Sequence, residues 1–354
     1  MRRPQTGYRP ELDGLRGIAV LSVMAAHYGV PWAQNGWLGV DLFFVLSGFL
    51  ITSILATEWQ RFGAIDFRAF YMRRALRLFP ALWLMLGVVG LFVPFEYIAS
   101  TLLYVNNWAI GLEVLPLTPW LGHVWSLAIE EQFYLIWPLV LVLLLRRFSP
   151  RKVALATLVL GIACAGWRVV LIAGGVSSGR VYYGTDSHAD GILLGSALGI
   201  ALVFDLLPQI PRLNIVSVAA VAALLVIGLL PVMPYAMYAW YAQPVANVAG
   251  LGVILAVIRG SGLLPRLLRL RPLVFVGTIS YGLYLWNVPI LMLPSNSSII
   301  SSAEVKLVLT VVVVLLSYRY VERPLLRRKS RWSRADGVDE GLRRSPGLGP
   351  VTSE

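Results

Sequence analysis

The sequence is poor in the residue types on which most soluble active sites depend. Of its 354 residues only one is cysteine, three are histidine and 14% are charged. The single cysteine, Cys164, excludes a disulfide framework and a thiol pair, and it is most simply a small apolar filler. No Gly-rich phosphate loop follows a strand pattern, which excludes a soluble coenzyme-binding fold. No internal repeat is visible, which disfavours an inverted-repeat transporter.

Apolar residues dominate instead. Hydrophobic residues make up 58% of the chain and the mean hydropathy is +0.73, as is typical of membrane proteins. Because hydrocarbon offers the backbone no hydrogen-bond partners, each long apolar run is predicted to be a helix. Such segments lie at 13–29, 37–56, 78–95, 124–145, 153–173, 188–207, 213–230, 235–258, 273–293 and 305–321. The predicted fold is all-α, a polytopic membrane helix bundle of about ten transmembrane helices.

Basic residues cluster between alternate segments. If residues 13–29 begin in the cytoplasm, nearly all arginines fall on the cytoplasmic side, and only Arg168, Arg180 and Lys306 fall outside. The positive-inside rule then predicts that both termini are cytoplasmic. This topology accounts for the net charge of +12 without a nucleic-acid partner, and it makes anionic membrane lipids the natural neighbours.

The two ends of the chain are expected to differ. The N-terminal stretch is basic and then apolar, like a secretory signal, but it contains charged and polar side chains and lacks a small-x-small site, so we expect no cleavage. Residues 1–328 are predicted to form one transmembrane domain. Residues 329–354, charged and rich in Gly and Pro, are predicted to be a disordered cytoplasmic tail.

Two costly side chains share one face of the first segment. Arg16 and His27 are eleven residues apart, and at 100° per residue this is only about 20° beyond three full turns and about 16 Å of rise. Polar residues inside spans usually face a bundle interior or a watery cavity and mark function. The alternative is that Arg16 and His27 reach the two headgroup layers.

Further titratable groups favour the functional interpretation. Segments that begin on the outer side carry Asp41, the neighbours Glu130 and Glu131, and the run Asp186, His188 and Asp190. Several helices bringing such groups to one depth predict a site, and a histidine with a carboxylate is the usual pairing for a general base. Metal binding is the rival use, but no HxxxH or HxxE spacing supports it.

The cytoplasmic side has a different character. The stretch "FYMRRALRLFP" places Arg74 and Arg77 at i and i+3 with Arg73 beside them. Paired guanidinium groups suit phosphate oxygens. The alternative is that these arginines only mark a cytoplasmic helix end.

In this order, the motifs resemble those of the acyltransferase-3 family of integral membrane O-acyltransferases, which modify lipopolysaccharide O-antigen, peptidoglycan, exopolysaccharides, Nod factors and macrolides. The resemblance rests on the basic-x10-His pattern from Arg16 to His27, "GWLGVDLFFVLSGFLIT", the Arg74-x-x-Arg77 element, "SLAIEEQFY", "DSHADGILLG", "ISYGLYLW" and the terminal "ERP".

The resemblance implies a multi-pass enzyme of the bacterial inner, or cytoplasmic, membrane. It implies that acyl-CoA, most often acetyl-CoA, is a co-substrate bound from the cytoplasm near Arg73, Arg74 and Arg77, with no bound cofactor or metal. The acceptor would be a hydroxyl of a glycan, a glycolipid or a macrolide. The acceptor's identity, the side of the membrane for the final transfer and the oligomeric state are left open.

The resemblance also implies individual roles. His27 would take the proton of the acceptor hydroxyl or relay the acyl group, with Glu130 as its helper. Arg16 would hold the donor or steady the carbonyl, and Asp41 is a further catalytic candidate. Tyr134, one turn after Glu130, could orient that carboxylate. Acceptor or supporting roles fall to Ser126, Glu131, Tyr134, Asp186, His188, Asp190 and Asn287.

The chain departs from the family pattern at three points. Asn287 in "YLWNVPI" stands where relatives commonly have histidine, and an amide cannot titrate. His188 stands where relatives often have arginine, a change that could follow the acceptor. No hydrolase-like domain is expected after the last segment, so the chemistry would belong to the membrane bundle.

Two other classes of function remain. A flippase or permease for a glycolipid or small molecule would use the same buried polar groups for passage, but it would not need an inner arginine pair and should not bind acyl-CoA. A non-catalytic scaffold for other envelope enzymes would not need His27 and Glu130.

Overall fold

The computed structural model describes residues 8–209, 212–232, 234–260, 262–294 and 302–327. Over these residues the chain is helical and contains no strand. The longer helices are α1 (Pro10–His27), α2 (Leu38–Phe62), α3 (Phe67–Val89), α6 (Trp125–Arg147), α7 (Pro150–Ala173), α10 (Asp190–Val203), α11 (Leu213–Leu229), α13 (Gln243–Arg259), α16 (Ser280–Leu291) and α17 (Ala303–Ser317). The shorter elements are α4 (Phe95–Leu102), α5 (Asn106–Gly111), the 3₁₀ helix η1 (Gly122–Val124), α8 (Ser178–Tyr183), α9 (Thr185–His188), α12 (Tyr235–Met237), the π-helix η2 (Tyr238–Ala242), α14 (Leu263–Leu268), α15 (Arg271–Thr278), the π-helix η3 (Tyr318–Glu322) and α18 (Arg323–Leu326). The predicted all-α class is confirmed, while the predicted tail at 329–354 lies outside the described residues.

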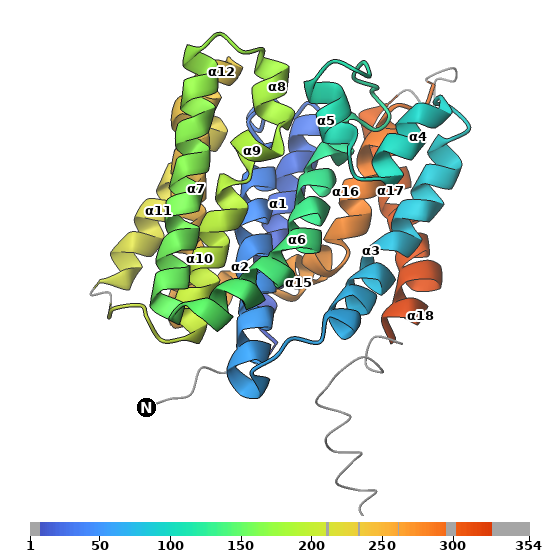
Figure 1. Cartoon of the computed structure of the whole chain (residues 1–354). Helices are drawn as coiled ribbons and strands as arrows, with labels where there is room; N and C mark the ends of the chain where they lie inside the picture. The colour runs from blue at the N-terminus through green and yellow to red at the C-terminus, as the bar shows by residue number, and fades with distance from the viewer. Residues whose placement is uncertain (1–7, 210–211, 233, 261, 295–301, 328–354) are drawn as a thin grey trace, which may run out of the picture.

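The bundle is organised around α1, α2 and α6. Figure 1 shows them in the middle, with α7, α10 and α11 to one side and α3, α16 and α17 to the other. The tightest neighbours, α2 and α10, approach through Gly48 and Gly195, where a Cβ would collide with a backbone carbonyl of the facing helix. Small residues of this kind let membrane helices pack backbone to backbone.

The two ends of the bundle differ in composition. One end, here the basic end, holds the start of α1, the end of α2 and the start of α3, with Arg9, Arg61 and Arg73. At the other, here the loop end, the short helices α4, α5, α8 and α12 gather (Figure 1). Every feature of the site can be placed relative to these two ends.

Membrane-spanning capacity is clear for only part of the bundle. By length and composition, four helical segments of the described chain can cross a membrane: Leu38–Phe62, Gly122–Arg147, Pro150–Ala173 and Tyr238–Arg259. A fifth is possible if α15 and α16, bent by 67° at their junction, form one broken span. Helices α10 and α11 are apolar but shorter. The protein is therefore a multi-pass membrane protein, and ten spans with cytoplasmic termini stay predictions.

A buried ion pair ties the loop-end half together. Arg168 on α7 is fully buried and forms a two-pronged pair with Asp190 at the start of α10, with both N···O distances 2.9 Å. Asn247 of α13 donates to the same carboxylate at 2.9 Å. Because a buried charge without a partner is strongly destabilising, this cluster fixes α7, α10 and α13 in register.

Candidate active site

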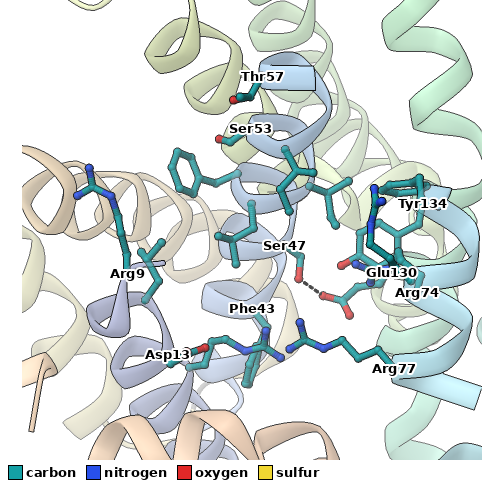
Figure 2. Close-up of a pocket in the computed structure, with 18 of the residues that line it drawn as sticks. Arg9, Asp13, Phe43, Ser47, Ser53, Thr57, Arg74, Arg77, Glu130 and Tyr134 are labelled. Atoms are coloured by element: carbon teal, nitrogen blue, oxygen red, sulfur yellow. Dashed lines mark hydrogen bonds between the residues drawn. The ribbon is translucent and has the colours of Figure 1, made fainter. Parts of the chain in front are cut away.

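A large cavity of about 2170 Å³ opens between α1, α2, α3, α6 and α16. Seven arginines line it, against four carboxylates. We call it the basic cavity, and its lining arginines are Arg9, Arg16, Arg61, Arg73, Arg74, Arg77 and Arg259. Figure 2 shows Arg9 on one wall and Arg74 and Arg77 on the opposite wall. The excess of cations predicts an anionic ligand.

The start of α3 positions the arginine pair. Asp66 caps the helix by accepting a hydrogen bond from the Ala69 amide at 2.9 Å, as N-cap carboxylates commonly do. From this start Arg74 and Arg77 project from one helix face into the basic cavity. The structure therefore brings the predicted pair together at the cavity wall.

Arg74 is held on both sides. Its guanidinium carbon lies 3.5 Å from the ring centroid of Tyr134 and its Nη2 is 3.6 Å from Glu131. The Glu130 carboxylate accepts a hydrogen bond from Ser47 on α2 at 2.6 Å (Figure 2). The orientation of Glu130 by Tyr134 stays a prediction.

Arg16 and Arg77 leave charge available to a ligand. Arg16 lies 5.9 Å from the Phe43 ring centroid, and its Nε is buried without a hydrogen-bond partner in the described chain. Arg77 lies close enough for mutual repulsion with Arg16. Two like charges facing one cavity are stabilised when an anion lies between them.

A second void of about 700 Å³ lies at the loop end. Five aromatic residues line it: Trp37, Trp125, Tyr182, Tyr183 and Tyr235. We call it the aromatic pocket. His27, the last residue of α1, also lines it, and Gly29 ends that helix with a φ of +70°. Arg16 and His27 thus line two different voids along one helix.

Asn287 fixes the tautomer of His27. The Nδ2 of Asn287 donates to the backbone carbonyls of Leu283 at 2.9 Å and Tyr284 at 2.6 Å. Its Oδ1 is therefore left to accept from His27 Nδ1, 2.6 Å away. Nδ1 then carries the proton, and Nε2, with no hydrogen-bond partner among the described residues, has a free lone pair.

A thin wall separates the two voids. His123 faces the aromatic pocket and Ser126, three residues on, faces the basic cavity. Tyr284 of α16 joins them, donating to the His123 carbonyl at 2.5 Å and pairing with the Ser126 hydroxyl at 2.7 Å. Helices α1, α6 and α16 contribute to both voids, and Trp37, the N-cap residue of α2, lines the aromatic pocket.

The predicted His27–Glu130 pair is not assembled. His27 ends α1 at the aromatic pocket, whereas Glu130 lies in the basic cavity beside Ser47. Glu130 is five residues beyond the start of α6. It therefore lies about 7.5 Å further from the loop end than the first residue of that helix does. Asn287, not a carboxylate, is the partner of His27.

The remaining predicted acidic cluster stays partly together. None of its members lines either void: Asp41, Asp186, His188 and Asp190. Asp41 accepts from Tyr238 and lies 3.4 Å from His188 Nε2, and Asp190 is taken up by Arg168. Asp41, His188 and Asp190 are buried, and the His188 ring packs against Trp125 and Tyr182 of the aromatic pocket.

Asp186 belongs to a surface pair. It binds Arg180 at 2.7 Å and accepts from the Trp167 indole at 2.9 Å. Partial burial raises the pKa of the Asp186 carboxyl, but these two donors outweigh it and hold the pKa below its usual range. The pair closes the turn that leads into α10.

Sequence reasoning missed four residues that the structure brings to the voids: Ser47, His123, Trp37 and Tyr235. His123 could have been found, because it is one of only three histidines and precedes Ser126 by one helical turn. Ser47, a lone hydroxyl within an apolar run, was a weaker signal. No local pattern marks Trp37 or Tyr235, which come together only through the fold. In the described parts of the chain, no three His, Cys, Asp or Glu side chains group as metal ligands would.

Comparison with known proteins defines the class. The sequence profile of the acyltransferase domain family matches residues 9–318. The chain therefore belongs to the acyltransferase-3 family, and fold and family together make it a membrane-embedded member of that class.

Three curated relatives are named as O-acetyltransferases. The chain is 36% identical to the peptidoglycan O-acetyltransferase OatA of Listeria monocytogenes, covering 90% of this chain and 56% of that protein. It is 33% identical to the O-acetyltransferase OatA of Staphylococcus aureus, covering 91% and 58%. It is 35% identical to the putative peptidoglycan O-acetyltransferase YrhL of Bacillus subtilis, covering 90% and 55%. The chain thus spans little more than half the length of these relatives. No solved structure matches.

Proposed function

We propose that the protein is an O-acyltransferase that moves an acyl group, in the first instance acetyl, from cytoplasmic acyl-CoA to a hydroxyl of a cell-envelope glycan. The observation that carries this proposal is the His27–Asn287 hydrogen bond, which leaves a basic nitrogen at a pocket opposite a cation-lined cavity. The relatives' names favour peptidoglycan as the glycan.

The basic cavity suits the donor. Coenzyme A carries several phosphate charges, and guanidinium groups bind phosphate through paired, charge-assisted hydrogen bonds. Arg77, Arg16 and the neighbouring cavity arginines offer such groups, and the unpaired Nε atoms of Arg16 and Arg74 are donors in need of an acceptor. The positive-inside pattern favours a cytoplasmic location for this end, where acyl-CoA is found.

The reaction follows from the two voids. The acceptor hydroxyl lies in the aromatic pocket and gives its proton to His27 Nε2 as its oxygen attacks the thioester carbonyl. The carbon–sulfur bond breaks, the new ester forms, and the protonated His27 returns the proton to the leaving thiolate. The thin arm of the coenzyme must pass the wall at Tyr284 and Ser126, whose hydroxyls lie 2.7 Å apart. Arg16 lies about 16 Å along α1 from His27, so it serves to hold the donor in the basic cavity.

The alternative is a permease for a glycolipid or small molecule. One observation favours it: the two voids face opposite ends and share α1, α6 and α16 with a wall between them. A permease would have no use for the tautomer of His27 that Asn287 selects, and it would not consume acyl-CoA.

The test is a transfer assay. Purified protein in liposomes receives acetyl-CoA labelled in the acyl group and a glycan acceptor, with wild type beside His27→Ala and the exposed-site control Trp32→Ala. We expect label in the glycan with wild type and the control, and none with His27→Ala. Normal transfer by a folded His27→Ala protein would contradict the proposal. Transport of the glycan across the membrane without incorporation of label would favour the permease.

A further inference from the structure

Three buried polar atoms of the aromatic pocket have no hydrogen-bond partner in the described chain. They are Trp37 Nε1, His123 Nδ1 and Tyr235 Oη. Folded proteins pair nearly all such atoms, because leaving one unpaired costs about 1–3 kcal/mol. Three in one pocket therefore indicate groups whose partners arrive with a ligand.

Each of these atoms has a defined hydrogen-bond role. The Trp37 indole N–H can only donate. His123 places its Nε2 3.2 Å from the Leu285 carbonyl, which can only accept, so Nε2 carries the proton and Nδ1 is an acceptor. The Tyr235 hydroxyl can do either. Together they match a ligand whose groups both donate and accept, as sugar hydroxyls do.

The walls of the aromatic pocket match the rest of a sugar. Trp125, Tyr182 and Tyr183 pack against one another, with Trp125 ring centroids 4.6 Å and 5.6 Å from the two tyrosines. Among the described residues, no Asp, Glu, Lys or Arg lines this pocket. Its volume of about 700 Å³ lies within the range of about 300–1,000 Å³ common for small-ligand sites. An uncharged ring with apolar faces and a polar edge fits this lining, whereas a phosphate or carboxylate does not.

We infer that the aromatic pocket is the acceptor subsite and that it takes an uncharged hexopyranose unit of the glycan. The sugar ring lies against the aromatic walls, and its hydroxyls bind Trp37, His123 and Tyr235. One further hydroxyl is then presented to His27 Nε2. This inference rests on the proposed transfer reaction and adds which chemistry selects the acceptor. The two voids would then bind ligands of different charge: the anionic donor in the basic cavity and the neutral acceptor in the aromatic pocket.

The test removes polar atoms and keeps the rings. Trp37→Phe deletes the indole N–H and Tyr235→Phe deletes the hydroxyl. Matched controls are Trp32→Phe and Tyr241→Phe, because these two side chains are 69% and 66% exposed. The probe is a soluble β-1,4-linked N-acetylglucosamine tetrasaccharide, with Kd measured by calorimetry and KM by acetyl transfer. Each pocket variant should raise Kd and acceptor KM about three- to tenfold, leaving the acetyl-CoA KM and the melting temperature at the control values.

A third variant separates positioning from folding. His123→Gln can keep the bond to the Leu285 carbonyl while losing the acceptor at Nδ1, and we expect a rise in acceptor KM of the same size. Unchanged Kd and acceptor KM in all three variants would overturn the inference, as would a wild-type protein that acetylates other acceptors but does not bind the tetrasaccharide. Failure of the transfer proposal is seen separately, as retained transfer by His27→Ala.

Discussion

The side-chain amide of Asn287 accepts a hydrogen bond from His27 Nδ1 across 2.6 Å, while its own NH₂ group is taken up by two backbone carbonyls. The amide therefore cannot flip without losing three bonds. A residue that cannot titrate thus sets the protonation pattern of one that can. It does so without adding a negative charge inside the bundle.

Asn287→Leu should lower kcat for acyl transfer by about 10²-fold, in the range of a misplaced general base. The leucine has a similar volume but offers no acceptor, so His27 loses its preferred tautomer. Donor KM should stay unchanged, because Asn287 does not line the basic cavity. Steady-state kinetics in liposomes measure both, and an unchanged kcat would show that the His27 tautomer does not limit the reaction.

Arg77→Ala should raise the acetyl-CoA KM by about tenfold or more, since hydrogen bonds to charged groups contribute about 1.5–3 kcal/mol. Arg77 is a cleaner probe than Arg74, whose guanidinium also stacks on Tyr134 and pairs with Glu131. Calorimetric titration with coenzyme A gives the binding constant directly. Arg180→Ala, at the loop end, is the control and should leave the donor affinity unchanged. If both substitutions changed the donor affinity equally, Arg77 would not bind the donor and would only mark a cytoplasmic helix end.

Asp190→Leu should destabilise the fold by about 3–5 kcal/mol, because it leaves the Arg168 guanidinium buried without its counter-charge. The double variant Arg168→Met with Asp190→Leu should recover a large part of this loss, since both charges are then gone. Thermal unfolding in detergent compares the three proteins. A double variant no more stable than Asp190→Leu would mean that the other hydrogen bonds of Asp190, not its charge, stabilise this region.

The pair of Asp186 and Arg180 should give a small pH-dependent contribution to stability. The folded-state pKa of Asp186 is lowered, so the unfolded chain binds the proton more readily. The contribution is therefore fully present above the unfolded pKa of about 4 and is lost as the pH falls through the lower, folded pKa. The melting-temperature difference between wild type and Asp186→Asn should accordingly shrink below pH of about 4. A difference that grew on acidification would contradict this sign.

The sequence predicted the helical class and several lining residues, because hydropathy and charge act locally. The face shared by Arg16 and His27 and the arginine pair on α3 follow from helical periodicity. Pairings between helices could not be read in the same way. The observed pairs are Glu130 with Ser47, His27 with Asn287 and Asp190 with Arg168. These pairs depend on the depth and rotation of each helix, which decide which side chains meet. The aromatic pocket depends on residues nearly two hundred positions apart, Trp37 and Tyr235, and no periodicity links them.

The wall of His123, Ser126 and Tyr284 has a consequence for energy coupling. Under the proposed reaction, the arm of the coenzyme reaches through this wall and withdraws, and only the acyl group stays on the other side. The membrane then needs no carrier for an activated donor, because cleavage of the thioester drives the transfer. The protein would therefore export an acyl group without transporting the donor that carried it.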